Sequence, residues 1–228
     1  MLEWTGDERW RDAWHESADA LWSRRDEHGL WIQRLHGTGI RFLGPPHGLV
    51  GNVLALERLL DSQRRTQLER DTAAILERTA VFEDGVANWP PIDRPELQSS
   101  DGAIRLQWCH GAPGILAAGA NRLDDELLLA GAELCWRAGP HGPEKGASLC
   151  HGTAGNGYAL LKAFERTGDE RWLDRARRFA VHALGQVERQ RAERGRGRYS
   201  LWTGDLGVAL YAADCLEGRS AYPIFDAA

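Results

Sequence analysis

The sequence has few cysteines and lacks any long hydrophobic run. Its four cysteines are spread over 228 residues, which excludes the dense spacing of a small secreted disulfide scaffold. No apolar run reaches about 18 residues, so no transmembrane helix is predicted. Residues 1–8 contain neither a basic segment nor an apolar core, so no signal peptide is visible. We therefore expect a cytoplasmic protein whose cysteines are reduced.

An excess of positive charge is also missing. The chain has 28 Lys and Arg against 33 Asp and Glu, a net charge of −5, so we expect no nucleic-acid partner. Glycine and tryptophan are abundant instead, with 26 and 10 residues. Repeated turns and large side chains at packing interfaces would explain both. The length allows a sizeable core, and we treat residues 1–228 as one domain.

Four Gly-x-x-Gly turns divide the chain. Their first glycines are Gly48, Gly111, Gly152 and Gly204, at offsets of 63, 41 and 52 residues. A short apolar segment follows each turn, and a longer charged amphipathic segment follows each of the first three. This pattern is typical of repeated helical hairpins. We therefore predict an all-α fold, an α/α toroid in which apolar inner helices are covered by charged outer helices.

The hydrophobic spacing predicts where these helices lie. Outer helices are expected at 7–24, 61–80, 124–138 and 169–193, and inner helices at 52–60, 114–121, 156–166 and 207–217. The stretch 82–106 is rich in Pro, Asp and Ser, and we interpret it as an irregular surface excursion.

One hexapeptide occurs twice. Residues 5–10 and 167–172 both read Thr-Gly-Asp-Glu-Arg-Trp. The second copy follows an inner helix, whereas the first has no room for one before it. We therefore expect a domain that lacks its N-terminal hairpins and forms an incomplete arc. Such an arc would expose the apolar sides of Trp-rich helices. We therefore expect a fragment, a partial gene product, or a subunit whose open edges are covered by a partner chain.

A Cys-His pair precedes two of the four turns. The pairs are Cys109-His110 and Cys150-His151. Catalytic zinc sites commonly use three protein ligands and leave a fourth position open. Cys109, Cys150 and His151 fit that count, and equivalent points of adjacent repeats are neighbours in a toroid. The alternative is that the two cysteines are small buried packing residues, as we expect for Cys135 and Cys215 within helices.

The charge of such a site favours thiol chemistry. Two thiolates and a neutral imidazole neutralise Zn²⁺, so a bound substrate thiolate makes the whole site anionic. That thiolate is deprotonated by the metal, against a free pKa of about 8.5, and retains much of its nucleophilicity. A zinc site of this composition is therefore better suited to activating thiols than water.

The two motifs resemble those of a known family. Residues 108–114 read WCHGAPG and residues 149–155 read LCHGTAG, and both resemble signatures of the lanthionine synthetase C-like family. Residues 47–51, HGLVG, resemble its upstream His-Gly-x-x-Gly turn. The order of the motifs agrees as well, and the resemblance covers nearly the whole chain.

The resemblance implies a fold, a cofactor and a reaction. The family fold is a seven-hairpin α/α toroid with central zinc, of which this chain would be the C-terminal portion. By resemblance, Cys109, Cys150 and His151 are the zinc ligands. Family members add a thiol, from a peptide cysteine or from glutathione, to a dehydroamino acid in a peptide or protein and so form a thioether.

Three further residues are candidates for the catalytic steps. Thiolate addition to an activated alkene produces an enolate, which needs a stabilising partner and a proton. By resemblance, His47 occupies the family's acid/base position and Arg105 matches a family arginine that supports the site. His110 lies beside the first ligand and is the other candidate proton donor. The alternatives are that His47 caps its helix and that Arg105 is a surface salt-bridge partner.

Two other functions remain open from the sequence. The first is a truncated, non-catalytic zinc-binding scaffold that binds a peptide or partner. The second is a carbohydrate-active α/α toroid with acids from loops, such as Asp84, Asp93 and Asp101. Glycosidases need a carboxylate pair that flanks the scissile bond, and no such pair stands out here.

Overall fold

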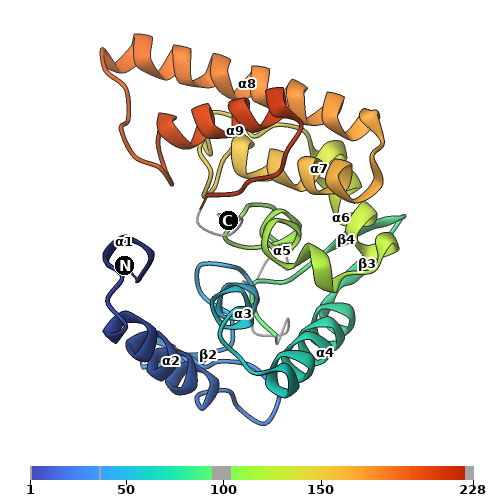
Figure 1. The fold of residues 1–228 in the computed structure, drawn as a ribbon. Coiled ribbons are helices and arrows are strands. Elements are labelled where there is room, and N and C mark those ends of the chain that lie inside the picture. The colour runs from blue at the N-terminus through green and yellow to red at the C-terminus, as the bar shows by residue number, and fades with distance from the viewer. Residues whose placement is uncertain (1, 36, 94–103, 224–228) are drawn as a thin grey trace.

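The fold consists mainly of helical hairpins (Figure 1). The computed structural model describes residues 2–35, 37–93 and 104–223. The inner helices are α3 (Leu49–Glu57), α5 (Ala112–Gly119), α7 (Thr153–Thr167) and α9 (Asp205–Glu217). The outer helices are α2 (Arg9–Trp22), α4 (Ser62–Thr79), α6 (Asp125–Ala138) and α8 (Glu170–Arg194). The predicted all-α fold is confirmed, and each predicted helix lies within a few residues of its expected position.

The inner helices form a consecutive series. Helix α3 packs against α5, α5 against α7, and α7 against α9, while each of the first three also contacts the outer helix that follows it. Figure 1 shows the result as an arc whose ends, at α2 and at α8 with α9, lie apart. No described helix is long and apolar enough to cross a membrane. That this arc is part of an α/α toroid remains a prediction.

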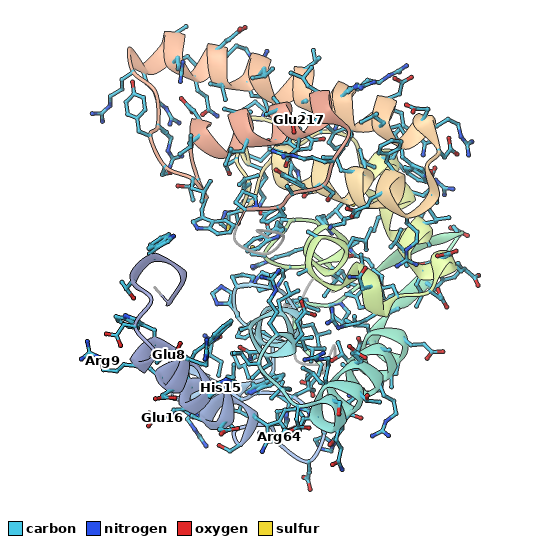
Figure 2. The ribbon with its side chains drawn as sticks, in the orientation of Figure 1. Glu8, Arg9, His15, Glu16, Arg64 and Glu217 are labelled. Atoms are coloured by element: carbon cyan, nitrogen blue, oxygen red, sulfur yellow. The ribbon has the colours of Figure 1, made fainter. Side chains whose placement is uncertain are left out.

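Burial explains which helices lie inside. Every residue of α5 is buried, whereas α2 buries only Ala18 and turns charged residues such as Arg9 and Glu16 outward (Figure 2). Three outer helices begin at an aspartate that accepts a backbone N–H of the first turn, as expected of an N-cap. These caps are Asp61, Asp124 and Asp169.

Two β-hairpins were not predicted. Strand β1 (Gln33–Leu35) pairs with β2 (Thr38–Ile40), and β3 (Val81–Glu83) pairs with β4 (Val86–Asn88), both antiparallel. The prediction of an irregular surface excursion is therefore wrong for its first part. Trp89, just after β4, is fully buried, and its indole N–H donates to the Leu76 carbonyl at 2.7 Å. Residues 94–103 lie outside the described part of the chain.

The four Gly-x-x-Gly turns share one backbone geometry. At every one of these glycines, a Cβ would lie 1.8–2.6 Å from the carbonyl oxygen of the residue six positions earlier. A real Cβ cannot approach an oxygen so closely, so the loop that precedes each inner helix folds back only if both glycines lack a side chain. Of the first glycines, only Gly111 also has a positive φ, of 104°.

The repeated hexapeptide adopts the same local structure twice. Gly6 and Gly168 have φ values of 65° and 66°, and Asp7–Arg9 and Asp169–Arg171 both form ion pairs of 2.6 Å. The first copy follows the short helix α1 (Leu2–Thr5), whereas the second follows α7. Trp172 is 7% exposed but the equivalent Trp10 is 42% exposed, so the α2 end of the arc presents an aromatic surface.

Candidate metal centre

A tight turn before α5 presents Cys109. Gln107 and His110 exchange two backbone hydrogen bonds of 3.0 Å, which leaves Trp108 and Cys109 at the corner between them. The Cys109 N–H also donates to the Cys150 carbonyl at 3.4 Å. The two Cys-His turns are therefore connected directly through their backbones.

The second turn, before α7, depends on the next repeat. The Cys150 N–H donates to the Trp202 carbonyl at 2.9 Å. The Trp202 ring stacks on Trp108 with centroids 4.9 Å apart, and Trp108 stacks in turn on Tyr222 at 5.1 Å. Stacked aromatic rings of this kind are rigid and bury large areas. They pack the loops that carry both cysteines against one another.

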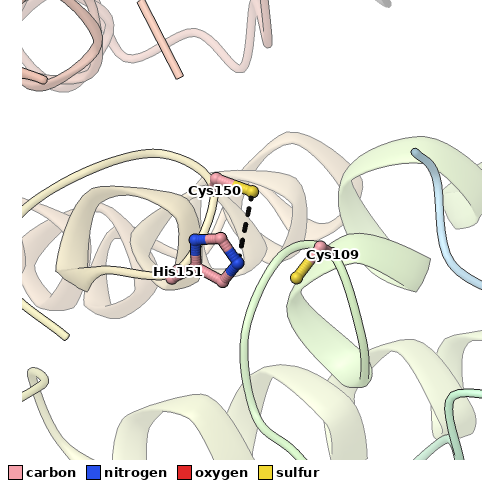
Figure 3. A group of neighbouring side chains, drawn as sticks. All are labelled: Cys109, Cys150 and His151. Atoms are coloured by element: carbon pink, nitrogen blue, oxygen red, sulfur yellow. Dashed lines mark hydrogen bonds between the residues drawn. The ribbon is translucent and has the colours of Figure 1, made fainter. Parts of the chain in front are cut away.

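Three ligand atoms meet at these turns. The Sγ atoms of Cys109 and Cys150 and a ring nitrogen of His151 lie within 4.8 Å of one another (Figure 3). Cys150 Sγ and His151 Nε2 are 3.7 Å apart. In a tetrahedral zinc site with ordinary bond lengths, a sulfur and a nitrogen ligand are about 3.6 Å apart. The three side chains thus have donor types that could hold a metal ion, and the separation of the adjacent Cys150 and His151 matches that of two zinc ligands.

The two thiols differ in acidity. A hydrogen bond from Cys150 lowers the pKa of Cys109 to about 7, and the Gln107 amide and the Arg105 charge contribute in the same direction. The hydrogen bond with Cys109, together with burial, raises the pKa of Cys150. Burial and the nearby Lys145 and Arg105 charges lower the pKa of His151, which favours its neutral, metal-binding form.

Comparisons with known proteins identify the family of this chain. A sequence model of the lanthionine synthetase C-like protein family matches residues 5–227. The chain belongs to this family. It is similar to the glutathione S-transferase LANCL1 of Danio rerio, with 32% identity over 132 residues, covering 54% of this chain and 32% of the relative. It is also similar to the LanC-like protein GCL1 of Arabidopsis thaliana, with 28% identity over 190 residues, covering 77% and 40%. The chain thus spans less than half the length of either relative.

Two histidines of this LanC-like chain lie beside the cluster without joining it. The rings of His47 and His110 are stacked with centroids 5.9 Å apart. Burial, followed by the charges of Arg105, His47 and His151, lowers the pKa of His110 to about 4, whereas His47 is exposed. The alternative that His47 caps its helix is not supported, because Gly48 is the N-cap of α3 and no side chain caps it.

Arg105 lies on the surface near Cys109, Cys150 and His151. It is exposed and forms no ion pair with another described residue, so the alternative of a surface salt-bridge partner finds no support. Its positive charge lowers the pKa of Cys109, His110 and His151. Arg105 therefore acts on the site through its field.

Sequence reasoning missed three residues that support the site. The Gln107 amide donates to Cys109 Sγ at 2.9 Å, and the Lys145 ammonium donates to the Gln107 carbonyl oxygen at 3.2 Å. Asn88, at the end of β4, accepts the Ala112 N–H at 2.8 Å and so caps α5. Nothing in the repeat pattern marks these positions, because the Lys145 and Asn88 contacts join residues 38 and 24 positions apart.

The remaining candidates lie elsewhere. Cys135 and Cys215 are buried within α6 and α9, as expected of core residues. Asp84 lies in the β3–β4 turn and Asp93 follows the second hairpin, while Asp101 lies outside the described residues. Membership of the LanC-like family leaves the carbohydrate-active alternative without support.

Proposed function

We propose that this LanC-like chain carries a zinc-dependent site that adds a thiol to a dehydroamino acid in a peptide or protein, forming a thioether. The observation that carries the proposal is the meeting of Cys109, Cys150 and His151 within 4.8 Å. The name of the Danio rerio relative, a glutathione S-transferase, supports glutathione as one thiol donor. A peptide cysteine is the other, and both substrates are expected in the cytoplasm.

The exposure of the ligands indicates the side on which substrate would enter. Cys109 is 4% exposed, whereas Cys150 is half-buried and His151 is exposed. When bound, zinc would hold a substrate thiol in its nucleophilic thiolate form at neutral pH. A substrate thiol would therefore reach these residues from the side of His151, because Cys109 is buried in the protein.

The reaction needs a positive field and one proton. The thiolate forms a C–S bond at the β-carbon, the alkene electrons move toward the carbonyl, and a proton must then reach the α-carbon. We assign the proton to His47 rather than His110, because His47 is exposed and can be reached by a substrate, whereas His110 is buried. Arg105 supplies the positive charge that favours the enolate.

Metal analysis and a thioether assay test this function. Elemental analysis of reduced protein should find one zinc per chain, and the Cys109→Ala and Cys150→Ala variants should lose it. Mass spectrometry should then detect a glutathione adduct on a dehydroalanine peptide, with a much lower yield for His47→Asn. Absence of zinc from the freshly purified protein would contradict the proposal.

A non-catalytic zinc-binding scaffold is the second candidate. It is favoured by the exposed Trp10 and Trp14 on α2. That aromatic surface is suited to a peptide or a partner chain. In this case zinc is bound, but no adduct forms in the assay with glutathione and the dehydroalanine peptide.

A further inference from the structure

The two cysteines of the cluster have different surroundings. Cys109 is buried, and its sulfur accepts a hydrogen bond of 2.9 Å from the side-chain amide of Gln107. Cys150 is only half-buried and has His151 Nε2 at 3.7 Å. The Cys109 sulfur is therefore hydrogen-bonded to a neutral amide inside the protein. Cys150 lies on the more exposed side of the cluster, next to His151.

Lys145 determines the orientation of the Gln107 amide. Its ammonium group lies 3.2 Å from Gln107 Oε1 and can only donate, so the amide oxygen has to face Lys145. The amide N–H₂ is then directed at Cys109. Gln107 and Cys109 are each 4% exposed, so water does not compete for the contact between them. The positive charge of Lys145 thus polarises the amide toward the sulfur.

The loop that carries Lys145 is itself held in place. Gln186 of α8 donates to the His141 carbonyl at 2.7 Å and accepts from Thr153 Oγ1 at 2.8 Å. Within the loop, the Gly146 N–H donates to the Gly142 carbonyl at 2.9 Å. Thr153 is the first residue of α7, two positions after His151. The Lys145 loop is therefore connected to the same helix terminus that presents the second half of the cluster.

We propose that Gln107 and Lys145 are positioning residues that hold Cys109 as the permanent metal ligand and withdraw charge from its sulfur. This inference rests on the proposed zinc site. A thiolate that accepts a hydrogen bond is a weaker nucleophile, so the dehydroamino acid is attacked by the substrate thiolate and not by Cys109. Outer-shell donors of this kind typically contribute about 10- to 100-fold to metal affinity.

Gln107→Glu is the most specific test, because it removes the hydrogen bond to Cys109 and keeps the contact with Lys145. The carboxylate has the shape of the amide and keeps an acceptor for Lys145, but it offers Cys109 no donor. We expect zinc affinity, measured by chelator competition, to fall about 10-fold or more. In the Co²⁺-substituted protein, the thiolate-to-metal charge-transfer band should move to lower energy. Mass spectrometry should also show faster alkylation of Cys109 by a dehydroalanine peptide.

Matched variants separate this role from a general effect on folding. Leu68→Ala removes a fully buried side chain of α4, a helix that carries no residue of the cluster, and it should lower thermal stability without moving the Co²⁺ band. Lys145→Met should weaken zinc binding less than Gln107→Glu, and Lys145→Arg, which keeps a donor, should restore the affinity.

The outcomes distinguish this inference from the proposed function. A wild-type protein that binds neither Zn²⁺ nor Co²⁺ contradicts the proposed function and this inference with it. A wild-type protein that binds both metals, together with a Gln107→Glu variant of unchanged affinity and spectrum, contradicts this inference alone.

Discussion

Gly114 illustrates how single residues shape the metal-binding turn. A Cβ at this position would lie 1.8 Å from the Trp108 carbonyl oxygen and 2.8 Å from Pro45 Cδ. The oxygen belongs to backbone that cannot move without moving the adjacent Cys109. Gly185, in the middle of α8, is the opposite case, since the nearest atom to its Cβ would be the flexible Arg189 guanidinium at 3.4 Å.

We therefore expect opposite effects from the same substitution at these two glycines. Gly114→Ala should lower the free energy of unfolding by about 2–4 kcal/mol and weaken zinc binding, because the turn must shift. Gly185→Ala should raise the free energy of unfolding by about 0.5–1 kcal/mol, since alanine is the better helix former. Urea denaturation measures both changes. A Gly114→Ala variant as stable as the wild type would show that the turn relaxes easily.

At the scale of elements, Asp26 connects the end of α2 to the first hairpin. Its carboxylate accepts the backbone N–H groups of His28 and Leu30 at 2.9 and 3.0 Å and pairs with the Arg41 guanidinium. Burial alone would raise the pKa of Asp26, but these hydrogen bonds and the Arg41 charge outweigh it and hold the pKa below its ordinary value. The charged form of Asp26 is thus stabilised by the fold.

The Asp26→Asn variant should lose this stabilisation in a pH-dependent way. Because the folded pKa is depressed, the contribution is present above the unfolded pKa of about 3.9 and is lost as the pH falls through the folded value. At pH 7 we expect a loss of about 1–3 kcal/mol in the free energy of unfolding. Urea titrations at pH 7, 5 and 3 should show the difference from wild type shrinking at the lowest pH. A constant difference would argue against an ionised Asp26.

At the scale of the whole molecule, the proposed metal joins two adjacent hairpins. Cys109 precedes α5, whereas Cys150 and His151 precede α7. An ion held by all three would oppose separation of the two hairpins, in addition to the packing between α5 and α7. Ligand binding to the folded state alone stabilises it by about 4 kcal/mol at a thousandfold excess over Kd.

Removal of zinc should therefore lower the melting temperature of the intact protein. We expect a strong chelator to reduce the midpoint in differential scanning calorimetry by several degrees, and added zinc to restore it. The Cys150→Ala variant provides the control, because its melting temperature should respond to neither treatment. Equal responses in the variant and the wild type would place the metal elsewhere.

The helices could be predicted from local signals. Apolar residues recur at helical spacing, aspartates mark the starts of three outer helices, and glycine pairs mark the starts of inner ones. The two hairpins were missed because their strands are only three residues long, too short for a periodic pattern. The sequence Asp84-Gly85 was an available signal, since both residues have the positive φ of a tight hairpin turn.

The sequence by itself determined the repeat, the positions of its helices and the choice of Cys109, Cys150 and His151, because equivalent points of neighbouring repeats must lie close together. Only the tertiary structure decided that Cys109 is buried and Cys150 is not. It also decided that His110 is buried whereas His47 is exposed, and that Gln107 and Lys145, 38 residues apart, are in contact beside Cys109 Sγ. Burial and hydrogen bonding depend on packing between hairpins, which local sequence patterns do not encode.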